Sequence, residues 1–258
     1  MKPQLSIAYY QQDIVWEDPL ANYAKVEQAF SHTDADILVV PETFTTGFSD
    51  NMARMAEPME SDTYRFALHM AQSHDALFVG TWTICDGTEV FNRLHWVRPD
   101  GTYGFYDKAH TFRMSSEASQ LARGSRRTTF EWRGWNIRPA VCYDLRFPKW
   151  LRNDRVGEDD LSFDLMIVCA NWPGSRHEAW STLLKARAIE NLSYVVGVNR
   201  VGTDGVGIPY TGNSALIDFK GQPISQCPSG QDAVLVGVLD ADALQQFRRH
   251  WPFYLDFD

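Results

Sequence analysis

Three residues of this sequence carry side chains suited to nucleophilic chemistry, and each stands at the end of a strand-like run. Glu42 follows the apolar run of residues 37–40, Lys108 follows a β-rich segment, and Cys142 ends the strand predicted at residues 137–142. In α/β proteins, ligands bind at the carboxyl ends of strands. A carboxylate, an ammonium group and a thiol gathered at that edge could activate a cysteine to attack a carbonyl carbon.

Each of these residues also has an ordinary structural interpretation. A glutamate at a strand end often meets solvent, and a lysine is usually solvated. A free cysteine is most often buried and inert. The segment around Cys142 favours chemistry, because a strand that runs into a turn before a helix start near Pro148 resembles the elbow that exposes a nucleophile. The backbone N–H groups that follow such an elbow can face an oxyanion.

The elements that position these residues alternate between short β-rich runs and amphipathic helices. Asp18 and Pro19 indicate the N-cap and first turn of a helix. Further helices are predicted at residues 61–74, 178–192 and 242–249, and strands at residues 5–10, 37–40, 77–80, 91–98, 103–106, 137–142, 165–169, 194–198, 214–219 and 233–239, the last two paired across residues 220–221. This pattern predicts a layered α/β architecture with helices covering the sheet faces.

Composition limits the classes of function. The 258 residues contain no repeat or linker, which favours a single domain, and their net charge of -9 argues against nucleic acid or an anionic membrane as a partner. The four cysteines form no CxxC pair and no zinc-like spacing, so no metal is expected. The N-terminus lacks the apolar core of a signal peptide, and no run has the length of a membrane span. A cytoplasmic protein with reduced thiols is predicted.

Taken together, the motifs resemble those of the nitrilase (carbon–nitrogen hydrolase) superfamily. Its members carry Glu, Lys and Cys in this order, within Pro-Glu, Tyr-Asp-Lys-x-His and Cys-Tyr-Asp-Leu-Arg-Phe-Pro contexts. Here the matching segments are residues 41–42, 106–110 and 142–148. The resemblance spans nearly the whole chain. It implies a four-layer αββα sandwich, one carbon–nitrogen hydrolase domain over residues 1–258, and no cofactor.

The resemblance also implies a role for each residue. Cys142 would be the nucleophile and Glu42 its general base, while Lys108 and the backbone N–H of Tyr143 would stabilise the oxyanion. A second glutamate usually lies between Lys and Cys, and Glu117 is the best match, although it could be a plain loop carboxylate. Its loop, residues 111–124, could act as a lid. His110 offers an alternative Cys–His pair, which the family pattern makes second choice.

Four segments most resemble bacterial omega-amidases, which implies a 2-oxoglutaramate or 2-oxosuccinamate substrate: residues 112–114, 131–135, 186–191 and 199–202. Phe44, Phe48 and Trp172 could form apolar pocket walls, although core packing of Trp172 is equally favoured. The substrate carboxylate needs a cationic partner. Arg113 is one candidate. Arg146 is another, but a structural ion pair beneath the cysteine elbow is favoured for it.

Other functions remain open from the sequence. Another amide, such as deaminated glutathione or an N-carbamoyl compound, could be the substrate, and nitrile hydration is less favoured. A catalytically silent interaction protein and a redox-sensing thiol are alternatives from other classes. The family resemblance implies at least a homodimer that pairs through helices. The aromatic tail, residues 251–254, could pack across that interface or fold back on its own subunit.

Overall fold

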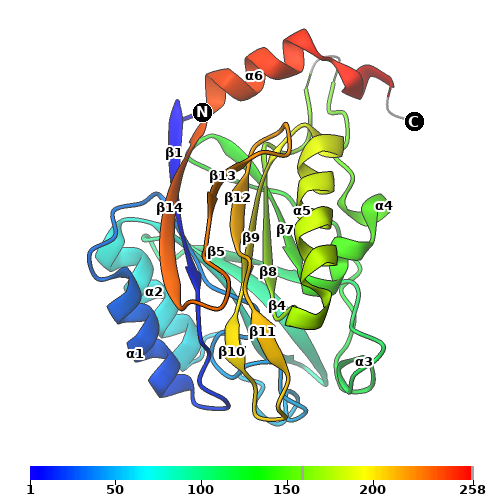
Figure 1. Ribbon diagram of the computed structural model, residues 1–258. Helices are drawn as coiled ribbons and strands as arrows, with labels where there is room; N and C mark the ends of the chain where they lie inside the picture. The colour runs from blue at the N-terminus through cyan, green and yellow to red at the C-terminus, as the bar shows by residue number, and fades with distance from the viewer. Residues whose placement is uncertain (158–159, 257–258) are drawn as a thin grey trace.

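Two six-stranded mixed sheets lie face to face, with helices on the outer side of each (Figure 1). The computed structural model describes residues 1–157 and 160–256. The order of layers is helix, sheet, sheet, helix. The predicted αββα sandwich is therefore confirmed.

The first sheet is built mainly from the N-terminal part of the chain. Its strands, in spatial order, are β14 (Ala233–Asp240), β1 (Gln4–Gln11), β2 (Ile37–Val39), β3 (Leu77–Asp86), β4 (Glu89–Val97) and β5 (Tyr103–Asp107). Strands β1, β2 and β3 run parallel, and the other neighbours are antiparallel. Helices α1 (Pro19–Phe30) and α2 (Asp62–His74) cover its outer face (Figure 1). The Asp18 side chain caps α1 by accepting from the backbone N–H of Ala21, as predicted.

The second sheet repeats the same arrangement with later segments. Its strands, in spatial order, are β13 (Pro223–Gln226), β12 (Ala215–Ile217), β9 (Tyr194–Asn199), β8 (Leu165–Ala170), β7 (Trp135–Val141) and β6 (Phe130–Trp132). Strands β7, β8 and β9 are parallel. Helix α5 (His177–Asn191) packs on the outer face of this sheet (Figure 1).

The remaining elements are short or lie at the margins. A separate hairpin joins β10 (Val201–Thr203) to β11 (Pro209–Thr211). The others are helices α3 (Glu117–Gln120), α4 (Pro148–Leu151) and α6 (Ala241–His250), and 3₁₀ helices η1 (Cys142–Arg146), η2 (Gly174–Arg176) and η3 (Phe253–Asp256). Among the described residues, no helix combines the length and the apolar character needed to cross a lipid bilayer.

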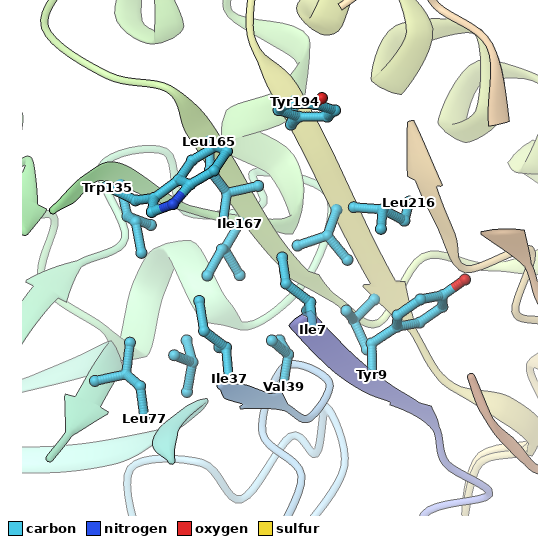
Figure 2. Packing of buried hydrophobic residues seen from close by; sticks show 14 of the residues in the cluster. Ile7, Tyr9, Ile37, Val39, Leu77, Trp135, Leu165, Ile167, Tyr194 and Leu216 are labelled. Carbon is cyan, nitrogen blue, oxygen red and sulfur yellow. The ribbon is translucent and has the colours of Figure 1, made fainter. Parts of the chain in front are cut away.

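Alternation along the strands builds the core between the sheets. In β1, Ile7 and Tyr9 point toward the second sheet, whereas Ala8 and Tyr10 pack under the helices. Figure 2 shows Ile7, Ile37 and Val39 of the first sheet facing side chains such as Ile167 from the second. Burying each large aliphatic side chain contributes about 1.5–3 kcal/mol, so this interface holds the two sheets in a fixed relation.

One predicted strand pairing is wrong. The segment at residues 214–219 does not pair with residues 233–239, because β12 forms a hairpin with the short strand β13 and also pairs with β9. Strand β14 crosses to the other sheet and pairs antiparallel with β1, where Gln4 lies opposite Asp240. The β13 sequence, Pro-Ile-Ser-Gln, is too short and polar to show the alternation typical of a strand.

One part of the aromatic tail folds back on its own subunit, and packing across a subunit interface stays a prediction. Tyr254 folds back on its own subunit and is buried against Leu161 and Leu192. Trp251 and Phe253 remain 48% and 54% exposed and stack on one another.

Candidate active site

The predicted catalytic residues meet at one edge of the sandwich. Glu42 follows β2, Lys108 follows β5 and Cys142 follows β7. Strand β5 is separated from β3 by two antiparallel steps, so it runs in the same direction as β2 and ends at the same edge. The core between the sheets then brings the thiol of one sheet close to the carboxylate and ammonium groups of the other.

A buried ion cluster forms the centre of the site. Lys108 Nζ donates to Glu42 Oε1 at 2.7 Å and to both carboxylate oxygens of Glu117, at 2.9 and 3.0 Å. All three side chains are buried, and buried charges persist only when they are paired in this way. The structure thus brings Glu117, which the sequence left open as a plain loop carboxylate, into direct contact with Lys108.

The charges of the cluster control its protonation. Burial acts to lower the pKa of Lys108, but the Glu117 and Glu42 carboxylates outweigh it and raise that pKa above its usual value. Lys108 therefore stays protonated at neutral pH. Burial raises the pKa of Glu117, against the opposing effect of Lys108.

Two asparagines fix the carboxylates. Asn92 Nδ2 donates to Glu42 Oε1 at 2.8 Å and to Glu117 Oε1 at 3.1 Å. The backbone N–H of Asn171 donates to Glu42 Oε2 at 2.7 Å. Sequence reasoning missed Asn92. The available signal was an asparagine inside a strand, where this residue type is uncommon.

Cys142 occupies a strained turn. Its φ of 43° lies in the left-handed region, which is costly for a residue with a side chain. The turn starts helix η1, so the strand-to-helix elbow expected from the sequence is present. Burial raises the pKa of the Cys142 thiol well above its usual value; the Glu42 carboxylate adds to this and Lys108 opposes it. The thiol is therefore protonated at neutral pH and needs a base when it reacts.

His110 supports the elbow and does not activate the thiol. The Asp144 carboxylate accepts from His110 N at 2.9 Å and lies 2.8 Å from His110 Nδ1. Asp144 also accepts from Tyr106 Oη at 2.8 Å and from Val141 N at 3.1 Å. The His110 ring stacks on Phe147. This geometry gives no support to a Cys–His pair, because the ring binds the carboxylate beneath the elbow.

A cavity of about 900 Å³ opens over Lys108 and Cys142. The structure places Phe48, Tyr143 and Trp172 on its wall, where the sequence had located substrate contacts. Trp172 is only 3% exposed and also packs on the core residue Trp180. Trp172 therefore both lines the cavity and packs in the core, the two roles that the sequence left open.

Phe44 corrects one of the predicted pocket walls. It is fully buried among aromatic rings on the outer side of the first sheet, including Phe78 and Trp82, and does not line the cavity. An extended chain would point Phe44 to the same side as Glu42. Thr43 instead adopts a φ of 43°, which turns the chain and directs the ring into the core.

The arginines of the site also differ from expectation. Arg113 is exposed and lies outside the cavity wall, because its loop turns it toward solvent. Arg146 lines the cavity and lies 5.0 Å from the Trp172 ring centroid. It forms no ion pair with any residue that the structure describes, so the structural ion pair favoured for it is not found there. Arg187 instead fills the space beneath the elbow and donates to the Leu145 carbonyl oxygen at 2.6 Å.

Two further segments border the cavity. Arg176, at the end of η2, lines it and lies 5.1 Å from the Phe112 ring centroid. Sequence reasoning stopped at the preceding Asn-Trp-Pro segment and missed this arginine. The β10–β11 hairpin contributes Asp204 and Tyr210. The loop predicted as a lid also lines the cavity, and Ser116 in this loop donates to Asp50, which lines the cavity as well.

Within the described part of the chain, no group of three or more His, Cys, Asp or Glu side chains is arranged to hold a metal ion. The available chemistry is a thiol beside a carboxylate and an ammonium group. This set suits a covalent attack on a carbonyl carbon with stabilisation of the resulting oxyanion.

Fold and site together define a carbon–nitrogen hydrolase. The chain belongs to this family, whose model matches residues 6–249. It is 42% identical over 255 residues to the omega-amidase YafV of Yersinia enterocolitica, covering 98% of this chain and 97% of that protein. It is 28% identical over 258 residues to the 2-oxoglutaramate amidase of Bacillus subtilis, covering 97% and 96%.

A solved structure supports the same assignment. XC1258 from Xanthomonas campestris, a CN-hydrolase superfamily protein with an arsenic adduct in its active site, matches with a TM-score of 0.94 and 42% identity. The match covers 99% of this chain and 97% of that one. The family resemblance noted from the three sequence motifs is thus confirmed.

Proposed function

We propose that this protein is an omega-amidase. It hydrolyses the terminal carboxamide of a small 2-oxo acid, 2-oxoglutaramate or 2-oxosuccinamate, to the 2-oxo dicarboxylate and ammonia. The observation that carries the proposal is the buried Glu42–Lys108–Glu117 cluster beside Cys142 in an open cavity. The similarity to an omega-amidase and to a 2-oxoglutaramate amidase over nearly the whole chain supports the choice of substrate.

The first half of the reaction forms a thioester. Glu42 takes the thiol proton while Cys142 Sγ attacks the amide carbon. The oxyanion is stabilised by Lys108 Nζ and the backbone N–H of Tyr143, and losing one such donor typically costs about 3 kcal/mol of transition-state stabilisation. Glu42 then gives its proton to the leaving nitrogen, the C–N bond breaks and ammonia departs. Glu117 orients Lys108 throughout.

The second half uses water to release the acid. Glu42 removes a proton from a water molecule that attacks the thioester carbon. The C–S bond breaks, and the proton held by Glu42 returns to the sulfur. One water molecule is consumed for each amide cleaved, and Cys142 is regenerated as a thiol.

An ammonia-release assay tests this function. The protein is incubated with 2-oxoglutaramate, glutamine, a simple nitrile and an N-carbamoyl amino acid. We expect the highest kcat/KM with 2-oxoglutaramate. We also expect a loss of about 10³-fold or more in Cys142→Ala, with Cys85→Ala, an exposed cysteine outside the cavity, as the matched control. If another compound is hydrolysed and 2-oxoglutaramate is not, the proposed substrate is wrong. If Cys142→Ala keeps normal activity, the proposed mechanism is wrong.

We further propose the setting in which the enzyme works. The chain forms one hydrolase domain over residues 1–258 and assembles into at least a homodimer. The exposed pair Trp251 and Phe253 supports an interface at the C-terminal end, because such apolar patches mark contact sites. A cytoplasmic location is supported by the four free cysteines, which are typical of a reducing compartment.

A further inference from the structure

Two arginines of the cavity carry positive charges that no carboxylate among the described residues neutralises. Arg146 and Arg176 line the same cavity as Cys142. Their guanidinium groups lie 5.0 Å and 5.1 Å from the ring centroids of Trp172 and Phe112, respectively. Within the described residues, neither guanidinium forms an ion pair. Both side chains are exposed, and the contacts with the aromatic rings restrain them while leaving their N–H donors available to a ligand.

The other charges around the cavity are already satisfied. Lys108 is paired with its two carboxylate partners. Asp204 accepts hydrogen bonds from its own hairpin, including one from Tyr210 Oη at 3.1 Å. Asp50 accepts from Ser116 Oγ. The unpaired charge of the cavity is thus positive, although the chain as a whole carries a net charge of -9. A cavity with this balance attracts an anion.

We propose that Arg146 and Arg176 form the subsite that binds the distal carboxylate of the amide substrate. This inference rests on the proposed function and deepens it: the arginines select amides that carry an anionic group at the other end. A planar guanidinium can donate two parallel hydrogen bonds to a carboxylate. Rings that fix the planes of two such groups prepare this geometry before the substrate arrives.

The dimensions fit a short dicarboxylic acid amide. Arg146 follows Cys142 by four residues in the same 3₁₀ helix, so a rise of about 2 Å per residue separates their Cα atoms by roughly 8 Å along the axis. The amide and carboxylate carbons of 2-oxoglutaramate are joined by four bonds of about 1.5 Å each, which extend to about 5 Å. The side chains of Cys142 and Arg146 can bridge the difference.

The subsite also predicts a preference between substrates of equal length. Glutamine and 2-oxoglutaramate share the amide and the carboxylate, but glutamine carries an ammonium group beside its carboxylate. Two guanidinium groups repel that ammonium group, whereas a 2-oxo group is uncharged and can accept a hydrogen bond from them. The arginines therefore favour the 2-oxo acid over the 2-amino acid.

The test compares a charged with an uncharged amide. For Arg146→Gln, Arg176→Gln and the matched control Arg113→Gln, kcat/KM is measured with 2-oxoglutaramate and with butyramide. The ratio of the two values is expected to fall about tenfold to 100-fold in each cavity variant, chiefly through a higher KM for 2-oxoglutaramate. In Arg113→Gln the ratio is expected to stay within about twofold, since this exposed arginine lies off the cavity wall. An equal fall for both substrates, or no fall, overturns the proposal.

A second measurement separates this inference from the proposed reaction. Glutarate has a carboxylate at each end and cannot be hydrolysed, so its protection of Cys142 against iodoacetamide reports binding without turnover. The half-protecting concentration is expected to rise about tenfold or more in both cavity variants. If 2-oxoglutaramate is not hydrolysed but protection by glutarate depends on the arginines, only the proposed reaction fails. If protection is unaltered in the variants, the arginine subsite fails.

Discussion

At the residue scale, the nucleophile is stored in its unreactive form. Burial and the neighbouring Glu42 carboxylate raise the pKa of the Cys142 thiol, and the single positive charge of Lys108 does not overcome them. In the proposed reaction, the thiol proton is transferred as the carbon–sulfur bond forms, to the Glu42 carboxylate that Asn92 and Asn171 hold in place. Such a thiol is protected from oxidation and alkylation while it waits for substrate.

Alkylation across pH tests this property. The thiolate is the reactive species, and a raised pKa means that its population still increases well above neutral pH. We expect the rate of iodoacetamide labelling at Cys142, followed by peptide mass spectrometry, to rise without a plateau up to about pH 9. Labelling of the exposed Cys85 in the same sample is the internal reference. A plateau below about pH 8 would show a thiolate formed in advance and would contradict the structure.

At the element scale, a single carboxylate joins the two segments that deliver Lys108 and Cys142. Asp144 binds the backbone N–H of Val141, just before the cysteine, and that of His110, just after the lysine. Its remaining partners, the side chains of Tyr106 and His110, both come from the segment around Lys108. Asp144 is therefore a positioning residue, which fixes the ammonium group relative to the sulfur without touching the substrate.

Asp144→Asn is expected to separate positioning from simple folding support. The amide cannot accept from all the donors, so we expect a loss of about 1–3 kcal/mol in the free energy of unfolding. We also expect kcat for 2-oxoglutaramate to fall about tenfold to 100-fold with KM nearly unchanged. Tyr106→Phe removes only one donor and is the milder comparison. A destabilised Asp144→Asn enzyme with normal kcat would reduce Asp144 to a structural role.

The elements and the site were predictable from the sequence to different degrees. Strand ends made Glu42, Lys108 and Cys142 candidates, since ligands bind at the carboxyl ends of strands, and the order and context of the family motifs then singled them out. Phe44 was misplaced because its direction depends on the left-handed turn at Thr43, which residue type alone does not reveal. The partner of β14 was misplaced because pairing between distant strands is decided by the closure of the whole sandwich.

At the scale of the whole molecule, Asp36 ties the two sheets together. Its carboxylate accepts from Lys2, just before β1, from Ser6 within β1, and from Arg133 in the turn between β6 and β7 of the second sheet. The Asp36 carbonyl oxygen also accepts from Trp132 Nε1 at 3.0 Å. Burial acts to raise the pKa of Asp36, but the hydrogen bonds from Lys2 and Ser6 and the charge of Arg133 outweigh it and lower that pKa.

Asp36→Asn should weaken this connection in a pH-dependent way. A carboxyl group whose pKa is lower in the folded state stabilises the fold above its unfolded pKa of about 3.9, and this stability is lost as pH falls through the folded pKa. We expect the variant to lose about 1–3 kcal/mol of unfolding free energy at pH 7. The difference from the unmodified protein should shrink toward pH 3. Urea unfolding at several pH values measures this, with the exposed Asp34→Asn as control. A constant difference would rule out the charge of Asp36 as its cause.

The division of the site between two sheets has a practical consequence. Glu42 and Lys108 come from the first half of the chain, and Cys142 and Asn171 come from the second. Neither half contains all of these site residues. Strand β14, near the C-terminus, nevertheless pairs with the full length of β1, near the N-terminus (Figure 1). If the chain were cut between the halves, pairing of β14 with β1 could join the two fragments again. Ammonia release would then occur only where the fragments had reassembled. Catalytic activity of the mixed fragments would therefore report their complementation, as in a split-enzyme assay.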